Sequence, residues 1–206
     1  MKRYCKVAAF LMITLAGVAQ TPKGWMMRVD RSTAAADPDA PGEIKFVTMG
    51  TGYHATNPQA AVYWNPANTA SGEYTLKGSF TLMKPSGHNN YYGLVFGGSG
   101  LEGAQQSYTY FLVAQNGTWL IKHREGDQTS NVKGRTPNDA VKKPGDDGKS
   151  TNDLEVRVGA DKIDFVVNGT VVDSEPKSAA KTDGIWGVRV NHLLEVHVDK
   201  LSATKG

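Results

Sequence analysis

The sequence has 206 residues, of which 39% are hydrophobic and 21% are charged. This length and composition suit one soluble domain with a single well-filled hydrophobic core. They exclude intrinsic disorder, collagen and a coiled coil as descriptions of the whole chain.

The N-terminus has the pattern of a secretory signal peptide. Lys2, Arg3 and Lys6 precede an uncharged run from Val7 to Val18, and the small residues Gly17-Val18-Ala19 suit a signal peptidase. The apolar run is shorter than the roughly 20 residues that span a bilayer. We therefore expect the protein to be secreted or periplasmic, with no membrane insertion.

Removal of residues 1–19 balances the charge. That segment holds three of the 23 basic residues and none of the 20 acidic ones, so the rest carries 20 of each sign. A balanced net charge offers no electrostatic case for binding nucleic acid. The only cysteine, Cys5, leaves with the segment, so we expect neither disulfides nor thiol catalysis.

Apolar and polar residues alternate along several segments after an N-terminal arm. Residues 20–42 contain three prolines and are interpreted as an arm lying over the domain. Alternation with a period of two predicts antiparallel strands with one wet face. It recurs in Tyr74–Met83, Leu154–Val158, Ile163–Val167 and Leu194–Val198.

Two further segments are apolar or aromatic at nearly every position. Tyr91–Phe96 and Tyr108–Ala114 are therefore expected to be central strands covered on both faces. Asn116-Gly117 and Asn168-Gly169 lie between such runs and predict hairpin turns. Both also begin glycosylation sequons, but turn chemistry explains them more simply.

These features predict an all-β fold with ten to twelve strands between Glu43 and Ala203. The fold class is an antiparallel two-sheet jelly-roll sandwich, formed as one domain over residues 43–206. Residues 127–152 are polar and lack aromatic side chains, so we predict a long functional or disordered loop there.

From Tyr74 onward the chain resembles the concanavalin A-like lectin/glucanase jelly rolls. It is most similar to bacterial exported domains of the laminin-G and 3-keto-disaccharide hydrolase types. The resemblance covers about 130 residues and implies lectins, polysaccharide hydrolases and adhesion modules as functional classes, because fold alone does not carry function. Its residues are Tyr91–Gly98, Tyr108–Leu112, Asn152–Val156, Phe165–Gly169, Gly187–His192 and Val196–Val198.

The last strand carries Glu195, His197 and Asp199 on one predicted face. Glucanases of the resembling superfamily place Glu-x-Asp-x-Glu on such a strand, whereas here a histidine takes the middle place. Glu195 and Asp199 would also lie about 13 Å apart on a regular strand, beyond the roughly 5 to 9.5 Å between glycosidase carboxyl groups. Glu195 and His197 are therefore weak catalytic candidates, and a solvated strand face is the simpler interpretation.

No metal site is predicted. Asp37-Pro38-Asp39 and Asp146-Asp147-Gly148 offer oxygen ligands, so calcium is retained as a candidate, although neither has the spacing of a known calcium loop. His192 and His197 lie on opposite strand faces, which does not favour a shared zinc ion.

Aromatic and planar polar side chains are the remaining candidates for a ligand site. Sugar rings stack on aromatic faces, and their hydroxyls bond to amides, carboxylates and arginine. Of the adjacent tyrosines 91 and 92, only one is expected to face the core, and core packing is expected for Trp186. The candidate ligand-binding residues are Trp64, Tyr91, Tyr92, Trp119, His123, Arg124, Arg189, Asn191 and His192.

The leading hypothesis is an exported module that binds a glycan or a cell-surface polysaccharide on one sheet face, beside the 127–152 loop. One alternative is a glycoside hydrolase or lyase with a site near Glu195, His197 and Arg124. The other is a structural or interaction domain without a small ligand. No cofactor is expected beyond the calcium retained above.

Overall fold

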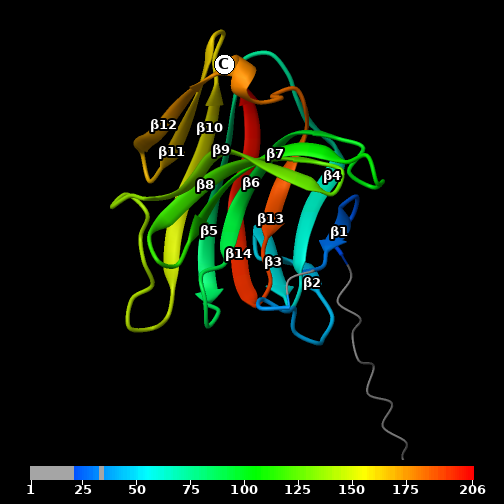
Figure 1. Cartoon of the computed structure of the whole chain (residues 1–206), viewed down its shortest axis with the longest axis vertical. Coiled ribbons are helices and arrows are strands. Elements are labelled where there is room, and N and C mark those ends of the chain that lie inside the picture. Colours follow the sequence, from blue (N-terminus) through cyan, green and yellow to red (C-terminus); the bar gives the residue numbers. More distant parts are fainter. Residues whose placement is uncertain (1–20, 33–34) are drawn as a thin grey trace, which may run out of the picture.

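The computed structural model describes residues 21–32 and 35–206, so the predicted signal peptide lies outside the described residues. Within them, fourteen strands form two seven-stranded antiparallel sheets that pack face to face (Figure 1). The predicted all-β jelly-roll sandwich is confirmed. In this part of the chain no helix is long and apolar enough to cross a membrane.

The first sheet has the strand order β1-β4-β13-β6-β7-β8-β9. Most of the predicted ligand-binding residues lie on it. Its strands are β1 (Met26–Asp30), β4 (Ala60–Ala70), β6 (Tyr91–Ser99), β7 (Ser107–Ala114), β8 (Thr118–Glu125), β9 (Gln128–Pro137) and β13 (Gly184–Val190).

The second sheet has the order β12-β11-β10-β5-β14-β3-β2. A short 3-10 turn, η1 (Lys177–Ala179), leads from this sheet back to the first. The strands are β2 (Lys45–Met49), β3 (Gly52–Asn57), β5 (Tyr74–Lys84), β10 (Ser150–Val158), β11 (Lys162–Val167), β12 (Thr170–Pro176) and β14 (Leu194–Lys205).

The two sheets differ in how their faces are covered. In β5 and β10, buried residues alternate with more exposed ones, as the sequence predicts for strands with one wet face. In β6 and β7, every residue from Tyr91 to Gly98 and from Ser107 to Ala114 is buried. These two strands are therefore covered on both faces, and the prediction that they are central is confirmed.

Two hydrophobic clusters produce this difference. The larger one fills the space between the sheets and includes Phe80, Tyr92, Phe111 and Phe165. The second contains side chains of opposite parity, such as Trp64, Tyr91 and Tyr108, and therefore lies on the outer face of the first sheet. That outer face carries the side chains that matter for the candidate site.

The predicted N-terminal arm is more regular than expected. Residues 26–30 form β1, which pairs with β4 from Met26 opposite Trp64 to Asp30 opposite Ala60. The arm thus adds an edge strand to the first sheet. This strand was missed because its stability comes from backbone hydrogen bonds to β4 and little of its own surface is fully buried.

The prediction of a loop over residues 127–152 is wrong over its first half. Residues 128–137 form β9, a polar edge strand that pairs with β8. The remaining segment is held against the domain, because Asn152 exchanges two hydrogen bonds with the backbone of Lys142 and Val141 is buried in the core. Edge strands need no apolar alternation, so the sequence pattern did not reveal β9.

Both Asn-Gly pairs lie in turns, as predicted. Asn168 and Gly169 have φ angles of 50° and 83° between β11 and β12, the conformation that a two-residue hairpin turn requires. Gly117 has a φ of 85° in the turn between β7 and β8, where Asn116 accepts a hydrogen bond from the backbone of Thr118.

The strands β4 and β6 both bulge where they flank Gly187 of β13. The register of β13 shifts between Ile185 and Gly187 against both β4 and β6. A Cβ atom at Gly187 would lie 2.1 Å from the carbonyl oxygen of Tyr63. Gly187 thus lets β4 approach at the bulge, two residues before Arg189.

We expect Gly187→Ala to lower the free energy of unfolding by about 1 to 3 kcal/mol, because the added methyl group overpacks against backbone that cannot move freely. Urea denaturation measures this change. Gly134→Ala is the matched control, since nothing lies within 4 Å of an added Cβ there. Equal stability of both variants would contradict the assigned role of Gly187.

Candidate functional site

A polar cleft of about 280 Å³ opens where the arm crosses the outer face of the first sheet. We call it the arm cleft. It brings together side chains that are remote in sequence, four of which were predicted to bind ligand: Arg124, Arg189, Asn191 and His192. Asp30, Asp37 and Asn90 also line it.

Asp30 is the electrostatic centre of the arm cleft. Its carboxylate is 5% exposed and contacts Arg189 directly, with Nη1 of Arg124 at 3.5 Å and Nε of Arg28 at 3.7 Å. Three guanidinium groups thus share one buried carboxylate as their ion-pair partner. Burial raises the pKa of Asp30, but attraction and hydrogen bonding by Arg189, assisted by Arg124 and Tyr108, outweigh it and lower the pKa overall.

Tyr108 completes this hydrogen-bonded group. Its hydroxyl donates to Asp30 Oδ2 at 3.2 Å and accepts from Arg189 Nη1 at 2.9 Å. Burial raises the pKa of Tyr108 to about 12, so the phenol stays protonated at neutral pH. The Arg189 guanidinium also lies 5.3 Å from the centre of the Tyr110 ring. Arg189 is therefore fixed from several directions.

The turn between β13 and β14 supplies the other side of the cleft. Asn191 Oδ1 accepts a hydrogen bond from Arg189 Nε at 3.2 Å, and its backbone N–H donates to the carbonyl of Tyr91. Leu193 adopts a positive φ of 59°, which allows the tight return into β14. Buried Asn90 donates to the His192 carbonyl at 2.8 Å and holds this turn in place.

The four aromatic residues that were predicted as ligand-binding candidates are all buried. Trp64, Tyr91, Tyr92 and Trp119 are each at most 3% exposed, so no sugar ring can stack on them. Tyr92 and Trp119 belong to the core between the sheets, and the outward-facing Trp64 and Tyr91 are covered within the outer cluster. Only Tyr92 faces the core, as expected for adjacent residues of a strand, but the outer face on which Tyr91 lies is covered as well.

The outer aromatics are covered partly by cations. The Arg135 guanidinium lies 5.6 Å from the centre of the Tyr91 ring, and that of Arg189 covers the Tyr110 ring in the same way at 5.3 Å. Burial and repulsion from Arg135 and Arg189 lower the pKa of Lys122 on the same sheet. Trp186, for which core packing was predicted, is partly buried against the main core.

Three other candidate residues lie away from the cleft. His123 shares the parity of Trp119 and Ile121, which face the core, and its Nδ1 pairs with Thr109. Glu195 lines a separate groove of about 560 Å³ beside Glu43 and Lys84. His197 lies on the second sheet, where its Nε2 is 2.9 Å from Asp199.

Sequence reasoning missed Asp30, His88 and Asn90. Asp30 follows the short run Met26–Val29, which was assigned to the arm and not to a strand. His88 and Asn90 lie in the loop between β5 and β6, where no periodicity or motif distinguishes them. Their importance comes from the residues that the fold places beside them.

No protein-family model matches the sequence, and no curated protein does. Among solved structures, the carbohydrate-binding module CBM66 from Bacillus subtilis has a TM-score of 0.61 and 12% identity, covering 88% of this chain and 96% of that one. A Bacillus subtilis protein of unknown function with a galectin-like fold has a TM-score of 0.56 and 13% identity, covering 89% and 90%.

A third match is the GH16 protein of the Bacteroides ovatus mixed linkage glucan PUL, in complex with G4G4G3G product. It has a TM-score of 0.54 and 9% identity, covering 91% of this chain and 97% of that one. At such low identities the matches show the fold alone. The resemblance to concanavalin A-like jelly rolls is confirmed at that level.

We expect Asp30→Asn to destabilise the protein by about 3 kcal/mol at pH 7, because it leaves the buried Arg189 without its countercharge. The folded-state pKa of Asp30 is lowered, so its stabilising contribution is present above the unfolded pKa of about 4 and is lost as the pH falls through the folded-state value. The difference between wild type and variant should therefore shrink as the medium is acidified.

Urea denaturation at several pH values between 7 and 3 measures this difference. Asp161→Asn is the control, because Asp161 is exposed and should change stability little at any pH. A destabilisation by Asp30→Asn that is the same at pH 7 and pH 3 would contradict an ionised Asp30 in the folded protein.

Proposed function

We propose that this protein is an exported, non-catalytic module that binds a glycan or a cell-surface polysaccharide in the arm cleft. The observation that carries the proposal is the convergence of carboxylate, guanidinium and amide groups from the arm, β8, β13 and the β13–β14 turn. Such planar groups match pairs of neighbouring sugar hydroxyls, because they donate or accept two hydrogen bonds side by side.

The cleft side chains are held before any ligand arrives. Arg189 is 8% exposed and bonded to Asp30, Tyr108 and Asn191, so little side-chain entropy remains to be lost on binding. Arg124 is fixed by Asp30 and by a hydrogen bond from its Nε to the Gly126 carbonyl. Preorganised polar groups of this kind favour selective recognition.

The proposed recognition is polar and does not rely on ring stacking. In the part of the chain that the structure describes, every Trp, Tyr and Phe side chain is buried or half-buried. Affinity would then come from hydrogen bonds to charged groups, which contribute about 1.5 to 3 kcal/mol each. The similar fold of CBM66 supports carbohydrate as the ligand class, and the cleft supports its location.

We expect the chain beginning at residue 20 to be depleted from solution by some members of a panel of soluble and insoluble polysaccharides, without release of reducing sugar. Arg124→Gln and Asn191→Ala should each weaken binding about tenfold, because each removes hydrogen bonds to the ligand. Arg157→Gln on the second sheet is the matched control and should bind as wild type does.

Thermal unfolding of each variant separates lost binding from lost folding. Binding that persists in Arg124→Gln and Asn191→Ala would remove the arm cleft from consideration. No depletion across a broad panel would instead favour a structural or interaction domain.

A hydrolase is the second candidate, and one observation favours it. Glu43 and Glu195 line the same groove, and glycoside hydrolysis uses a pair of carboxyl groups. On this hypothesis the same panel assay would show sugar release that Glu195→Gln abolishes. Release that is unchanged in that variant, or is never seen, would exclude a catalytic role for Glu195.

A further inference from the structure

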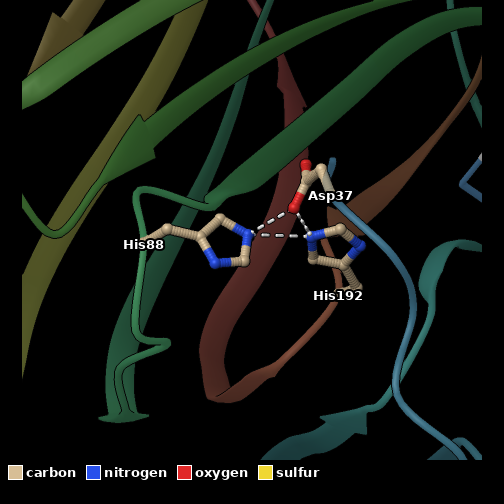
Figure 2. Close-up of side chains that lie close together, drawn as sticks. All are labelled: Asp37, His88 and His192. Atoms are coloured by element: carbon tan, nitrogen blue, oxygen red, sulfur yellow. Dashed lines mark hydrogen bonds and ion pairs between the residues drawn. The ribbon is translucent and has the colours of Figure 1, made fainter. Parts of the chain in front are cut away.

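Three side chains from distant parts of the chain converge beside the arm cleft. Figure 2 shows Asp37 from the arm, His88 from the β5–β6 loop and His192 from the β13–β14 turn, all pointing toward one another. Asp37 Oδ1 lies 2.6 Å from His88 Nε2 and 3.0 Å from His192 Nε2. The two Nε2 atoms are 3.1 Å apart.

The protonation of His192 is determined by its other nitrogen. Its Nδ1 lies 2.9 Å from Asp39 Oδ1, and because an ionised carboxylate can only accept a hydrogen bond, this contact favours the tautomer with its proton on Nδ1. In the neutral ring the lone pair is then on Nε2 and is directed at the Asp37 carboxylate. Two electron-rich atoms at 3.0 Å repel each other unless a cation lies between them.

Either a proton or a metal ion satisfies that requirement, and the third group favours a metal. His88 brings a second imidazole Nε2 to the same point, so three atoms able to ligate lie within 4.8 Å of one another. Two imidazoles and one carboxylate form a common ligand set for zinc and other divalent transition metals. Calcium prefers oxygen ligands, so nitrogen at two positions argues against the calcium retained for Asp37-Pro38-Asp39.

Outer hydrogen bonds orient His192. Asp39 receives the Nδ1–H of His192 on one oxygen and the backbone N–H of Ser32 on the other, at 2.8 Å. A carboxylate that fixes the ring of a histidine in this way accompanies most metal-bound histidines. Asn90 holds the His192 carbonyl with a hydrogen bond of 2.8 Å.

The burial of the three residues suits entry of an ion from solvent. The side chain of His192 is 6% exposed, whereas those of His88 and Asp37 are 43% and 47% exposed. One ligand is therefore rigid, and two are accessible from outside. Since Asp37 and His192 also line the arm cleft, an ion held here would have its remaining positions near that cleft.

We propose that Asp37, His88 and His192 bind a divalent transition-metal ion, with zinc as the reference ion, and that Asp39 orients His192 for it. The ion links the N-terminal arm to the β5–β6 loop and the β13–β14 turn. This proposal does not depend on glycan binding, because all three protein ligands come from this chain and metal binding is measured without any sugar.

The test is isothermal titration of ZnCl2 into metal-free protein beginning at residue 20, with the thermal unfolding temperature measured alongside. We expect one zinc ion per chain and a higher unfolding temperature with zinc, because an ion that binds only the folded state stabilises it. His88→Gln should weaken zinc binding at least tenfold. Asp39→Asn should weaken it about tenfold through the orientation of His192.

His197→Gln is the matched control, since it removes a histidine that also faces an aspartate but lies on the second sheet. Its ring centre is 6.2 Å from that of His54, so this pair is the alternative place for a zinc ion. Zinc binding that is lost in His197→Gln and kept in His88→Gln would overturn the proposal. So would wild-type binding no tighter than that of His88→Gln, which would show a cluster held by hydrogen bonds alone.

Cobalt gives a readout of the ligands themselves. Substitution with Co2+ should produce visible d–d absorption that zinc displaces and that His88→Gln reduces in intensity. The unliganded His88→Gln chain should unfold at nearly the wild-type temperature, because His88 is exposed. An absorption spectrum that is identical in wild type and His88→Gln would contradict ligation by His88.

Discussion

The buried carboxylate of Asp30 is the interaction on which the outer face of the first sheet depends. Arginines 28, 124 and 189 approach that one group from three different strands: β1 at one edge, β8 beside the other edge strand, and β13 beside the central strand β6. A guanidinium held over an aromatic cluster is costly without a partner. Asp30 removes this cost, and because it ends β1 it also ties the arm to the sheet. The arm cleft forms where this contact brings the arm against the outer face of the sheet.

The coverage of this sheet explains both the successes and the failures of sequence reasoning. Continuous apolar runs in β6 and β7 correctly indicated central strands, because such runs occur where both faces are covered. Because both faces are covered, Tyr91 and Trp64 are not accessible to a ligand. Parity assigns a side chain to one of two faces, but it does not say whether other side chains cover that face.

Edge strands and loops were the other features that could not be predicted from the sequence. β1 and β9 are polar or short, and each is held by pairing with one neighbour, so alternation gave no signal. Arg124, Arg189, Asn191 and His192 could be selected by residue type, because planar and titratable groups are those that bind ligands. His88 could not, since its 104-residue separation from His192 is closed only by the sandwich topology.

The amino-acid composition also does not show where the charges lie in the folded chain. Beyond residue 19 the acidic and basic residues are equal in number, yet the arm delivers Asp30, Asp37 and Asp39 to a face that presents arginine and histidine. The three aspartates have different partners. Asp30 pairs with the arginines, and Asp39 pairs with Nδ1 of His192. Asp37 lies between the imidazoles of His88 and His192. The contacts of Asp30 and Asp39 do not involve the Nε2 atoms of the two imidazoles. Asp37 alone is directed at a position where three ligand atoms converge, so it is the arm residue through which the site can respond to an added ion.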